Sequence, residues 1–137
     1  MRNVLKYVWQ LPQNVVGFFL VFIFNRKSTL KVLDKNTNII YYRCKHVNDC
    51  GVSLGKYIVL DLDRKIAEQT LKHEFGHQRQ SLYLGPFYLI AIGLPSAIGN
   101  LFDRYFHKNW KSSKRYKWYY SQPWEKWADK LGEVERF

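Results

Sequence analysis

The five residues from His73 to His77 constrain this chain more than any other stretch. They read His-Glu-Phe-Gly-His, an H-E-x-x-H pattern. Residues four apart lie on nearly the same face of an α-helix, so His73 and His77 can direct their imidazoles at one point. Glu74 lies about 100° round the helix from His73, close enough to polarise a metal-bound water without being a ligand itself. The pattern therefore predicts a helix that carries two zinc ligands and a catalytic carboxylate.

The residues around the motif favour a helix over 64–84. Leu71, Phe75 and Leu82 fall on the side opposite His73 and predict a core stripe. Gly76 costs a helix roughly 1 kcal/mol relative to Ala, which indicates that another element packs closely against it. The sequence Gly85-Pro86 predicts the end of the helix. The alternative interpretation is an exposed helix that carries two histidines by chance.

A second helix is predicted over 121–132, near the C-terminal end of the chain. Ser121 is a good N-cap residue, Pro123 suits the first turn, and Gly132 suits the end. A catalytic zinc ion needs a third protein ligand and an open position, and this helix contains the best candidate for that ligand.

Glu125 and Asp129 are four residues apart and so lie on one face of the second helix. Glu125 is predicted to be the third zinc ligand. Asp129 is predicted to accept a hydrogen bond from the second nitrogen of a ligand histidine, which would fix its tautomer. The alternative interpretation makes Glu125 an ordinary acid favoured near a helix N-terminus by the helix dipole.

An H-E-x-x-H helix followed by E-x-x-x-D resembles the gluzincins, the thermolysin-like zinc metallopeptidases. The resemblance covers the two motif helices and the strands before them, and small bacterial H-E-x-x-H proteins are similar in layout. It implies one Zn²⁺ per chain held by His73, His77 and Glu125, with Glu74 as general base and Asp129 as the outer partner of His73. It also implies a peptide or protein substrate whose peptide bond is hydrolysed.

Peptide hydrolysis also calls for a donor that stabilises the oxyanion. The sequence offers His107, Tyr119 and Tyr120 for this role, without a preference among them.

The region 28–63 is predicted to form a sheet. Residues 29–33 and 39–44 read as a hairpin around a turn at 34–38, and 51–61 supplies one or two further strands. We expect an edge strand at Gly51, Val52, Ser53 and Leu54 that binds an extended peptide by main-chain pairing, or else an ordinary strand. At 137 residues the chain is predicted to be a single minimal zincin-like domain of α+β class, with a small antiparallel sheet beside the two motif helices.

Two apolar segments are predicted to face a membrane. Residues 1–27 contain an apolar run of ten residues, shorter than the roughly 20 that span a bilayer, so they are expected to lie in or dip into a membrane face. Residues 86–102 carry no charge, but Gly93, Pro95 and Gly99 interrupt them, which predicts a re-entrant hairpin or two short interfacial helices over the site. The alternative for both segments is packing on the core.

The net charge of +11 comes from 22 basic and 11 acidic residues. Between 104 and 120, six basic residues alternate with seven aromatic residues and no acid. Trp and Tyr prefer the membrane interface, and Lys and Arg prefer anionic headgroups, so the mixture predicts an anionic membrane surface as partner. The excess of positive charge predicts that this surface is the cytoplasmic face of the membrane. Single-stranded nucleic acid would also suit the mixture but is disfavoured beside the two apolar segments.

Cys44 and Cys50 are predicted to be free thiols in a reducing cytoplasm, with a disulfide as the alternative. Three functions from different classes follow from the sequence. They are a membrane-associated zinc peptidase, a zincin-like binding module without activity, and a basic lipid- or nucleic-acid-binding protein in which the H-E-x-x-H is accidental. The intact Glu74 favours the first, since a non-catalytic site has no chemical need for it.

Overall fold

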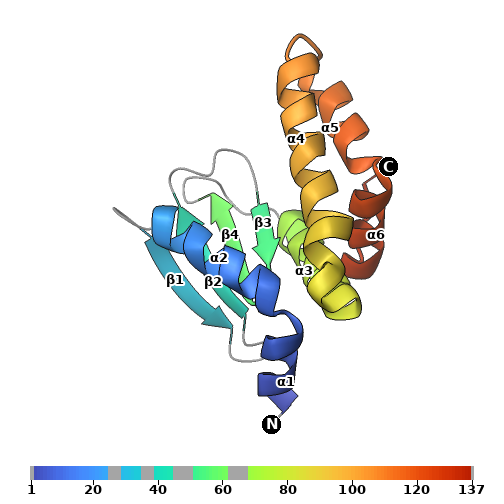
Figure 1. The fold of residues 1–137 in the computed structure, drawn as a ribbon. Helices are drawn as coiled ribbons and strands as arrows, with labels where there is room; N and C mark the ends of the chain where they lie inside the picture. The colour runs from blue at the N-terminus through green and yellow to red at the C-terminus, as the bar shows by residue number, and fades with distance from the viewer. Residues whose placement is uncertain (1, 25–28, 35–38, 45–50, 62–67, 137) are drawn as a thin grey trace.

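A computed structural model describes residues 2–24, 29–34, 39–44, 51–61 and 68–136 (Figure 1). The fold is of α+β class, as predicted. The α-helices are α1 (Arg2–Trp9), α2 (Leu11–Phe24), α3 (Glu68–Leu84), α4 (Leu94–Phe106), α5 (Ser112–Tyr120) and α6 (Pro123–Gly132). Two further helical turns, η1 (Gly85–Phe87) and η2 (Leu89–Gly93), connect α3 to α4.

The four strands among the described residues form one sheet in the order β1-β2-β4-β3. Their bounds are β1 (Thr29–Asp34), β2 (Ile39–Cys44), β3 (Gly51–Leu54) and β4 (Tyr57–Asp61). The predicted hairpin of β1 and β2 is confirmed, and β3 and β4 form a second antiparallel pair. The expectation of a wholly antiparallel sheet is wrong, because β2 and β4 are parallel. The apolar sequence of β4 fits this central place, since a strand with a parallel neighbour is usually buried on both faces.

Helices α2 and α3 cover opposite faces of the sheet. Val59 of β4 clusters with Val21 of α2, whereas Ile58, which points to the other face, packs with Leu71 and Phe75 of α3. Successive side chains of a strand alternate between faces, so β4 contributes to both cores. Helices α4, α5 and α6 stand together beside this layered unit (Figure 1).

Helix α3 matches the predicted zinc helix in its described part, which starts at Glu68; the predicted first residues, 64–67, lie outside the described residues. Leu71 and Phe75 form the predicted core stripe. Leu82 does not belong to it, because this side chain is 37% exposed. The helix ends at Leu84 as predicted, where Gly85 takes a left-handed φ of 53°.

The predicted interruption of 86–102 is wrong, because this segment is helical. It runs through η1 and η2 into α4. Pro95 stands in the first turn of α4, where a helix needs no N–H donor, and Gly93 closes a π-helical turn instead of a break. No described helix is both long enough and apolar enough to cross a membrane.

The predicted start of α6 needs a smaller correction. Gln122 is its N-cap, whereas the Ser121 hydroxyl donates to the Trp118 carbonyl and so belongs to the end of α5. Pro123 opens α6 as predicted, and the left-handed residue that ends it is Glu133, one position beyond the expected Gly132. The predictions for Cys44 and Cys50 concern side chains that the structure does not describe.

Candidate metal centre

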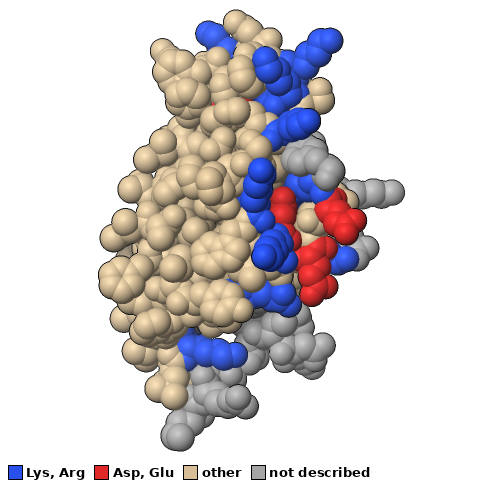
Figure 2. Space-filling model, turned by 90° about the vertical axis from the view of Figure 1, so that its right-hand side faces the viewer, with Lys and Arg blue, Asp and Glu red and all other residues tan. Residues whose placement is uncertain are grey.

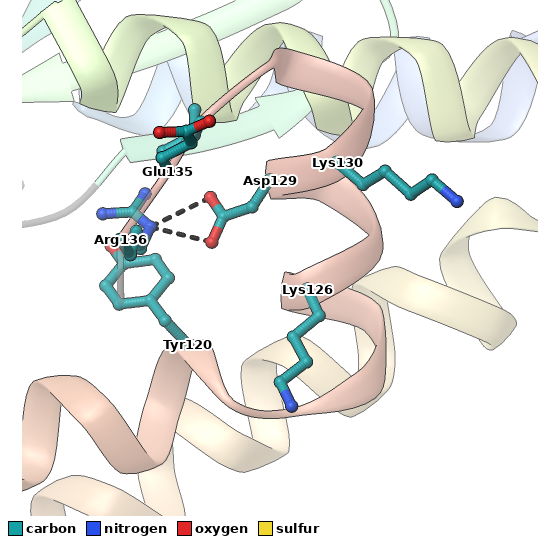
Figure 3. Close-up of a pocket in the computed structure, with 7 residues that line it drawn as sticks. Tyr120, Lys126, Asp129, Lys130, Glu135 and Arg136 are labelled. Atoms are coloured by element: carbon teal, nitrogen blue, oxygen red, sulfur yellow. Dashed lines mark hydrogen bonds and ion pairs between the residues drawn. The ribbon is translucent and has the colours of Figure 1, made fainter.

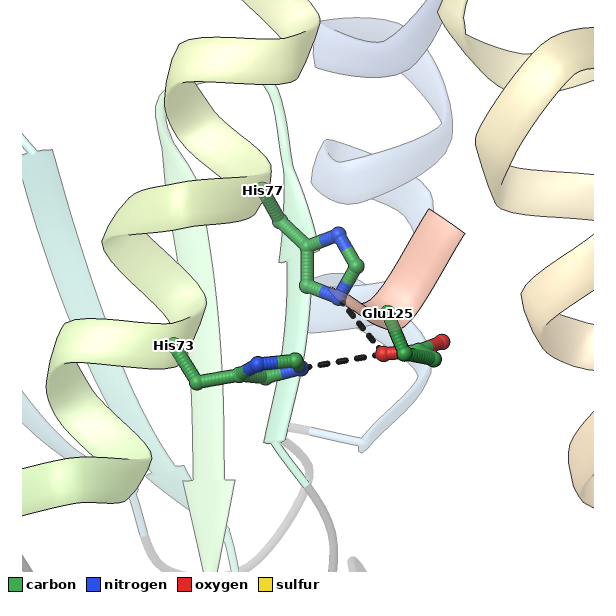
Figure 4. A group of neighbouring side chains, drawn as sticks. All are labelled: His73, His77 and Glu125. Atoms are coloured by element: carbon green, nitrogen blue, oxygen red, sulfur yellow. Dashed lines mark hydrogen bonds and ion pairs between the residues drawn. The ribbon is translucent and has the colours of Figure 1, made fainter. Parts of the chain in front are cut away.

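Helices α3 and α6 bring the three predicted ligands together. The Nε2 atom of His73 lies 3.0 Å from Oε2 of Glu125, and Nε2 of His77 lies 3.2 Å from the same oxygen (Figure 4). The three ligand atoms all lie within 4.8 Å of one another, and all three residues are buried. Two imidazoles and one carboxylate with an open position are the donor set of many catalytic zinc sites.

Two glycines let the backbones of α3 and α6 approach closely. A Cβ atom at Gly76 would lie 1.9 Å from the carbonyl oxygen of Ala128, and one at Gly132 would lie 2.1 Å from the carbonyl oxygen of Lys72. The prediction that another element packs against Gly76 is therefore confirmed. This close contact sets the distance between the histidines on α3 and the carboxylate on α6.

We expect Gly76→Ala to lower the free energy of unfolding by about 3 kcal/mol, since the methyl group would overlap backbone that cannot rotate away. The control is Gly99→Ala in α4, where the nearest atoms to a new Cβ lie 3.7 Å and 4.0 Å away. This control should raise stability by about 0.5 to 1 kcal/mol, because Ala favours a helix over Gly. Urea unfolding of the two variants checks both values, and equal stability would contradict the close helix contact.

The second nitrogen of each histidine is occupied by an acceptor. Nδ1 of His73 donates to Asp129 over 2.7 Å, as predicted, and Nδ1 of His77 donates to Oε1 of Gln80 over 2.7 Å. The amide nitrogen of Gln80 donates to the Trp124 carbonyl over 2.8 Å, which fixes the orientation of this amide. Both imidazoles therefore carry a proton on Nδ1 and direct Nε2 at the cluster.

This proton arrangement fits a metal ion. When neutral, His73 and His77 each present an Nε2 lone pair to the Glu125 carboxylate, which also holds only lone pairs. Three acceptors that meet without a proton repel one another unless a cation lies among them. Hydrogen-bonded outer partners at Nδ1 are also typical of metal-binding histidines. The residues present thus suit Zn²⁺.

The electrostatics of the cluster point the same way. Burial opposes the charged form of His73, but hydrogen bonds with Asp129 and Glu125 outweigh it and raise its pKa to about 9. Burial also opposes ionisation of Glu125, yet hydrogen bonds with His73 and His77 hold its pKa well below its usual range. The site therefore favours positive charge at its centre.

The other oxygen of Glu125 is held by Ser96, a residue that sequence reasoning missed. The Ser96 hydroxyl of α4 donates to Oε1 over 2.6 Å, and its oxygen lies 3.0 Å from the Tyr119 hydroxyl.

Gln80, the partner of His77, could have been found from its position three residues after His77 on the same helix. Ser96 gives no such signal, because its contact depends on how α4 packs.

Asp129 is shared between His73 and a second partner, Arg136, which sequence reasoning also missed. Nε of Arg136 donates to both carboxylate oxygens of Asp129, over 2.9 Å and 2.8 Å (Figure 3). The guanidinium lies 3.7 Å from the centroid of the Tyr120 ring. Tyr120, Asp129 and Arg136 all line an open pocket of about 430 Å³.

Glu74 lies beside the cluster and is 3% exposed. Its Oε2 has no hydrogen-bond partner among the described residues. Burial raises its pKa, whereas His77 and His73 oppose this shift. A Cβ atom at Gly51 would lie 2.2 Å from Oε1, so the carboxylate lies against the start of β3. A buried carboxylate oxygen without a partner is costly and is typical of a group that acts on a ligand.

Two of the three predicted oxyanion donors lie at the site. The Tyr120 ring stands edge-on to His73 with 5.1 Å between centroids, and Tyr119 reaches Glu125 through Ser96. Burial raises the pKa of both tyrosines well above the usual range, so both keep their hydroxyl protons. His107 is not brought to the site.

His107 belongs to a separate group at the far end of α4. Its Nδ1 lies 3.1 Å from Asp103, and its ring stacks on Trp110 with 3.7 Å between centroids. Arg115 donates to the other oxygen of Asp103 over 3.0 Å and 2.7 Å. This network ties α4 to α5 and gives His107 a structural role.

The predicted edge strand also lies where expected. Strand β3, which consists of Gly51, Val52, Ser53 and Leu54, is at the edge of the sheet and pairs only with β4 among the described strands. Gln78 of α3 donates to the Ser53 hydroxyl over 2.7 Å and so joins the strand to the zinc helix. No family model, curated protein or solved structure matches this chain.

Proposed function

We propose that this protein is a zinc-dependent metallopeptidase. The observation that carries the proposal is the buried His73, His77 and Glu125 cluster, in which both imidazoles direct Nε2 at one carboxylate oxygen. The resemblance of the two motifs to the gluzincins supports the same reaction class. His73, His77 and Glu125 would hold Zn²⁺, which when bound lowers the pKa of water and polarises a carbonyl.

Glu74 is the general base in this proposal. Its unpartnered Oε2 is available to take a proton from the attacking water and to pass it to the leaving amine. The raised pKa that burial gives Glu74 suits both steps, because a base that must return its proton works best when its pKa is near the working pH.

The substrate in this proposal is a peptide in extended form. Strand β3 has one edge free of strand partners among the described residues, and its first residue, Gly51, lies against Glu74. A peptide that pairs with this edge would pass the general base. Tyr119 or Tyr120 would supply the hydroxyl donor for the oxyanion, since both keep their protons.

The test is hydrolysis of an unfolded, fluorescently labelled casein. We expect activity that is lost when 1,10-phenanthroline removes zinc and that returns when about one equivalent of zinc per chain is added. Circular dichroism should show that the metal-free protein keeps its helices, which separates loss of metal from loss of fold. Activity that survives complete zinc removal would overturn the proposal, whereas zinc binding without any hydrolysis would favour a binding module.

A further inference from the structure

We propose that the apolar side of this protein docks onto an anionic lipid bilayer through two helical stripes. The proposal does not depend on the proposed catalytic function. The first stripe runs along α2 with a spacing of three and four residues, so its members share one face. It consists of Leu11, Val15, Phe18, Phe19, Phe22 and Ile23, each between 44% and 66% exposed.

The second stripe runs from η1 through η2 and along α4. Its members are again three or four residues apart. It consists of Phe87, Ile90, Leu94, Ile98, Leu101 and Tyr105, each between 55% and 74% exposed. Soluble proteins rarely leave this many large apolar side chains exposed on neighbouring elements, so the two stripes indicate a surface with a partner.

The two stripes belong to one side of the molecule. Leu20 of α2 and Leu89 of η2 pack against the same core cluster, which consists of Leu54, Tyr88 and Ile92, so α2 and η2 border one core. Figure 2 shows the charged side chains along its right-hand part and at its top, whereas the left-hand part, which is the front of Figure 1, is tan over most of its height. In the sequence, 7–25 and 80–102 contain no charged residue.

Basic residues border this apolar side where the second stripe ends. Exposed Lys108, Lys111, Lys114 and Lys117 follow directly after α4, and residues 104–124 contain no acid. Each Lys or Arg near an anionic membrane contributes about 1 kcal/mol to binding. Trp110 lies under this basic segment, with Nζ of Lys114 3.8 Å from its ring centroid. An apolar surface with a basic and aromatic border matches the interface of a bilayer.

A lipid surface fits this side better than a second copy of the chain. Two copies would each bring a net charge of +11, with basic segments at the edge of the shared contact. Like charges near an interface oppose association, whereas anionic headgroups neutralise the same residues. Nucleic acid would use the basic segment but would leave both apolar stripes uncovered.

The experiment is flotation of the full chain with vesicles of phosphatidylcholine containing 30% phosphatidylglycerol, compared with vesicles of phosphatidylcholine alone. We expect binding to the anionic vesicles that falls as salt rises. The double variant Phe22→Ser, Leu101→Ser removes one exposed side chain from each stripe and should weaken binding about 100-fold. Thermal unfolding of this variant should match the wild type, because both side chains are exposed.

Charge variants separate specific docking from general attraction. Lys108→Gln with Lys111→Gln at the border should weaken binding about 30-fold at low salt. The matched control, Lys126→Gln with Lys130→Gln on α6, removes the same charge beside the pocket of Figure 3 and should weaken it far less. Equal losses for both pairs would overturn the proposal, and so would unchanged binding of the stripe variant. A dimer that Phe22→Ser, Leu101→Ser dissociates, with no vesicle binding, would assign the surface to a second copy.

Discussion

The variant Glu74→Gln is expected to keep zinc and to lose hydrolysis by a factor of about 10² to 10⁴, the usual contribution of a general base. Gln has nearly the shape of Glu, so the substitution preserves packing against Gly51 while removing the basic oxygen. It also removes a buried carboxylate whose Oε2 has no partner among the described residues, so the fold should not be weakened. Labelled casein and elemental analysis measure the two quantities.

The control for this variant is Gln78→Glu, which places a carboxylate on the same helix outside the cluster, next to Ser53. This control should keep both zinc and most of the activity. Hydrolysis by Glu74→Gln at the wild-type rate would mean that the activity comes from elsewhere in the chain or from a contaminant.

The variant His77→Ala is expected to lower zinc affinity by more than about 100-fold. Loss of a residue that only hydrogen-bonds to a metal ligand costs about 10- to 100-fold, and this variant removes a ligand itself. It leaves Glu125 with one imidazole partner in place of two. The matched control is Glu74→Gln, which changes a residue on the same helix that is not a ligand. Competition with a zinc-binding dye gives both affinities, and equal affinities would contradict the role of His77.

Helical spacing was enough to predict most of the metal cluster. His73 and His77, and likewise Glu125 and Asp129, share a face because each pair is four residues apart, and this holds in any well-formed helix. Gly76 is informative for a different reason. A glycine destabilises a helix, so its presence indicates that another element packs too closely to leave room for a side chain. In this structure that element is the backbone of Ala128.

Features that depend on tertiary packing could not be predicted in the same way. Strands β2 and β4 pair in parallel, and no local pattern in either strand records which strand becomes its neighbour. The hydrogen bond from Ser96 to Glu125 joins residues 29 positions apart in the chain. The bond from Arg136 to Asp129 arises where the chain turns back after α6.

The apolar segments show how one pattern can give two structures. Gly93 and Pro95 predict a break in 86–102, yet Pro95 falls in the first turn of α4, where proline is tolerated. The apolar run at Val15–Phe24 predicts either a membrane-facing segment or a core helix, and α2 has both a buried and an exposed side. Val21 packs on the sheet, whereas Phe22 is 64% exposed.

The most direct test of the metal centre is the zinc content of the purified protein by elemental analysis, after reconstitution with zinc and removal of the excess. The account predicts about one zinc per chain in the wild type and in Glu74→Gln, and much less than one in His77→Ala. A wild-type protein that binds no zinc, although circular dichroism shows it to be folded, would contradict the metal centre and the peptidase proposal built on it.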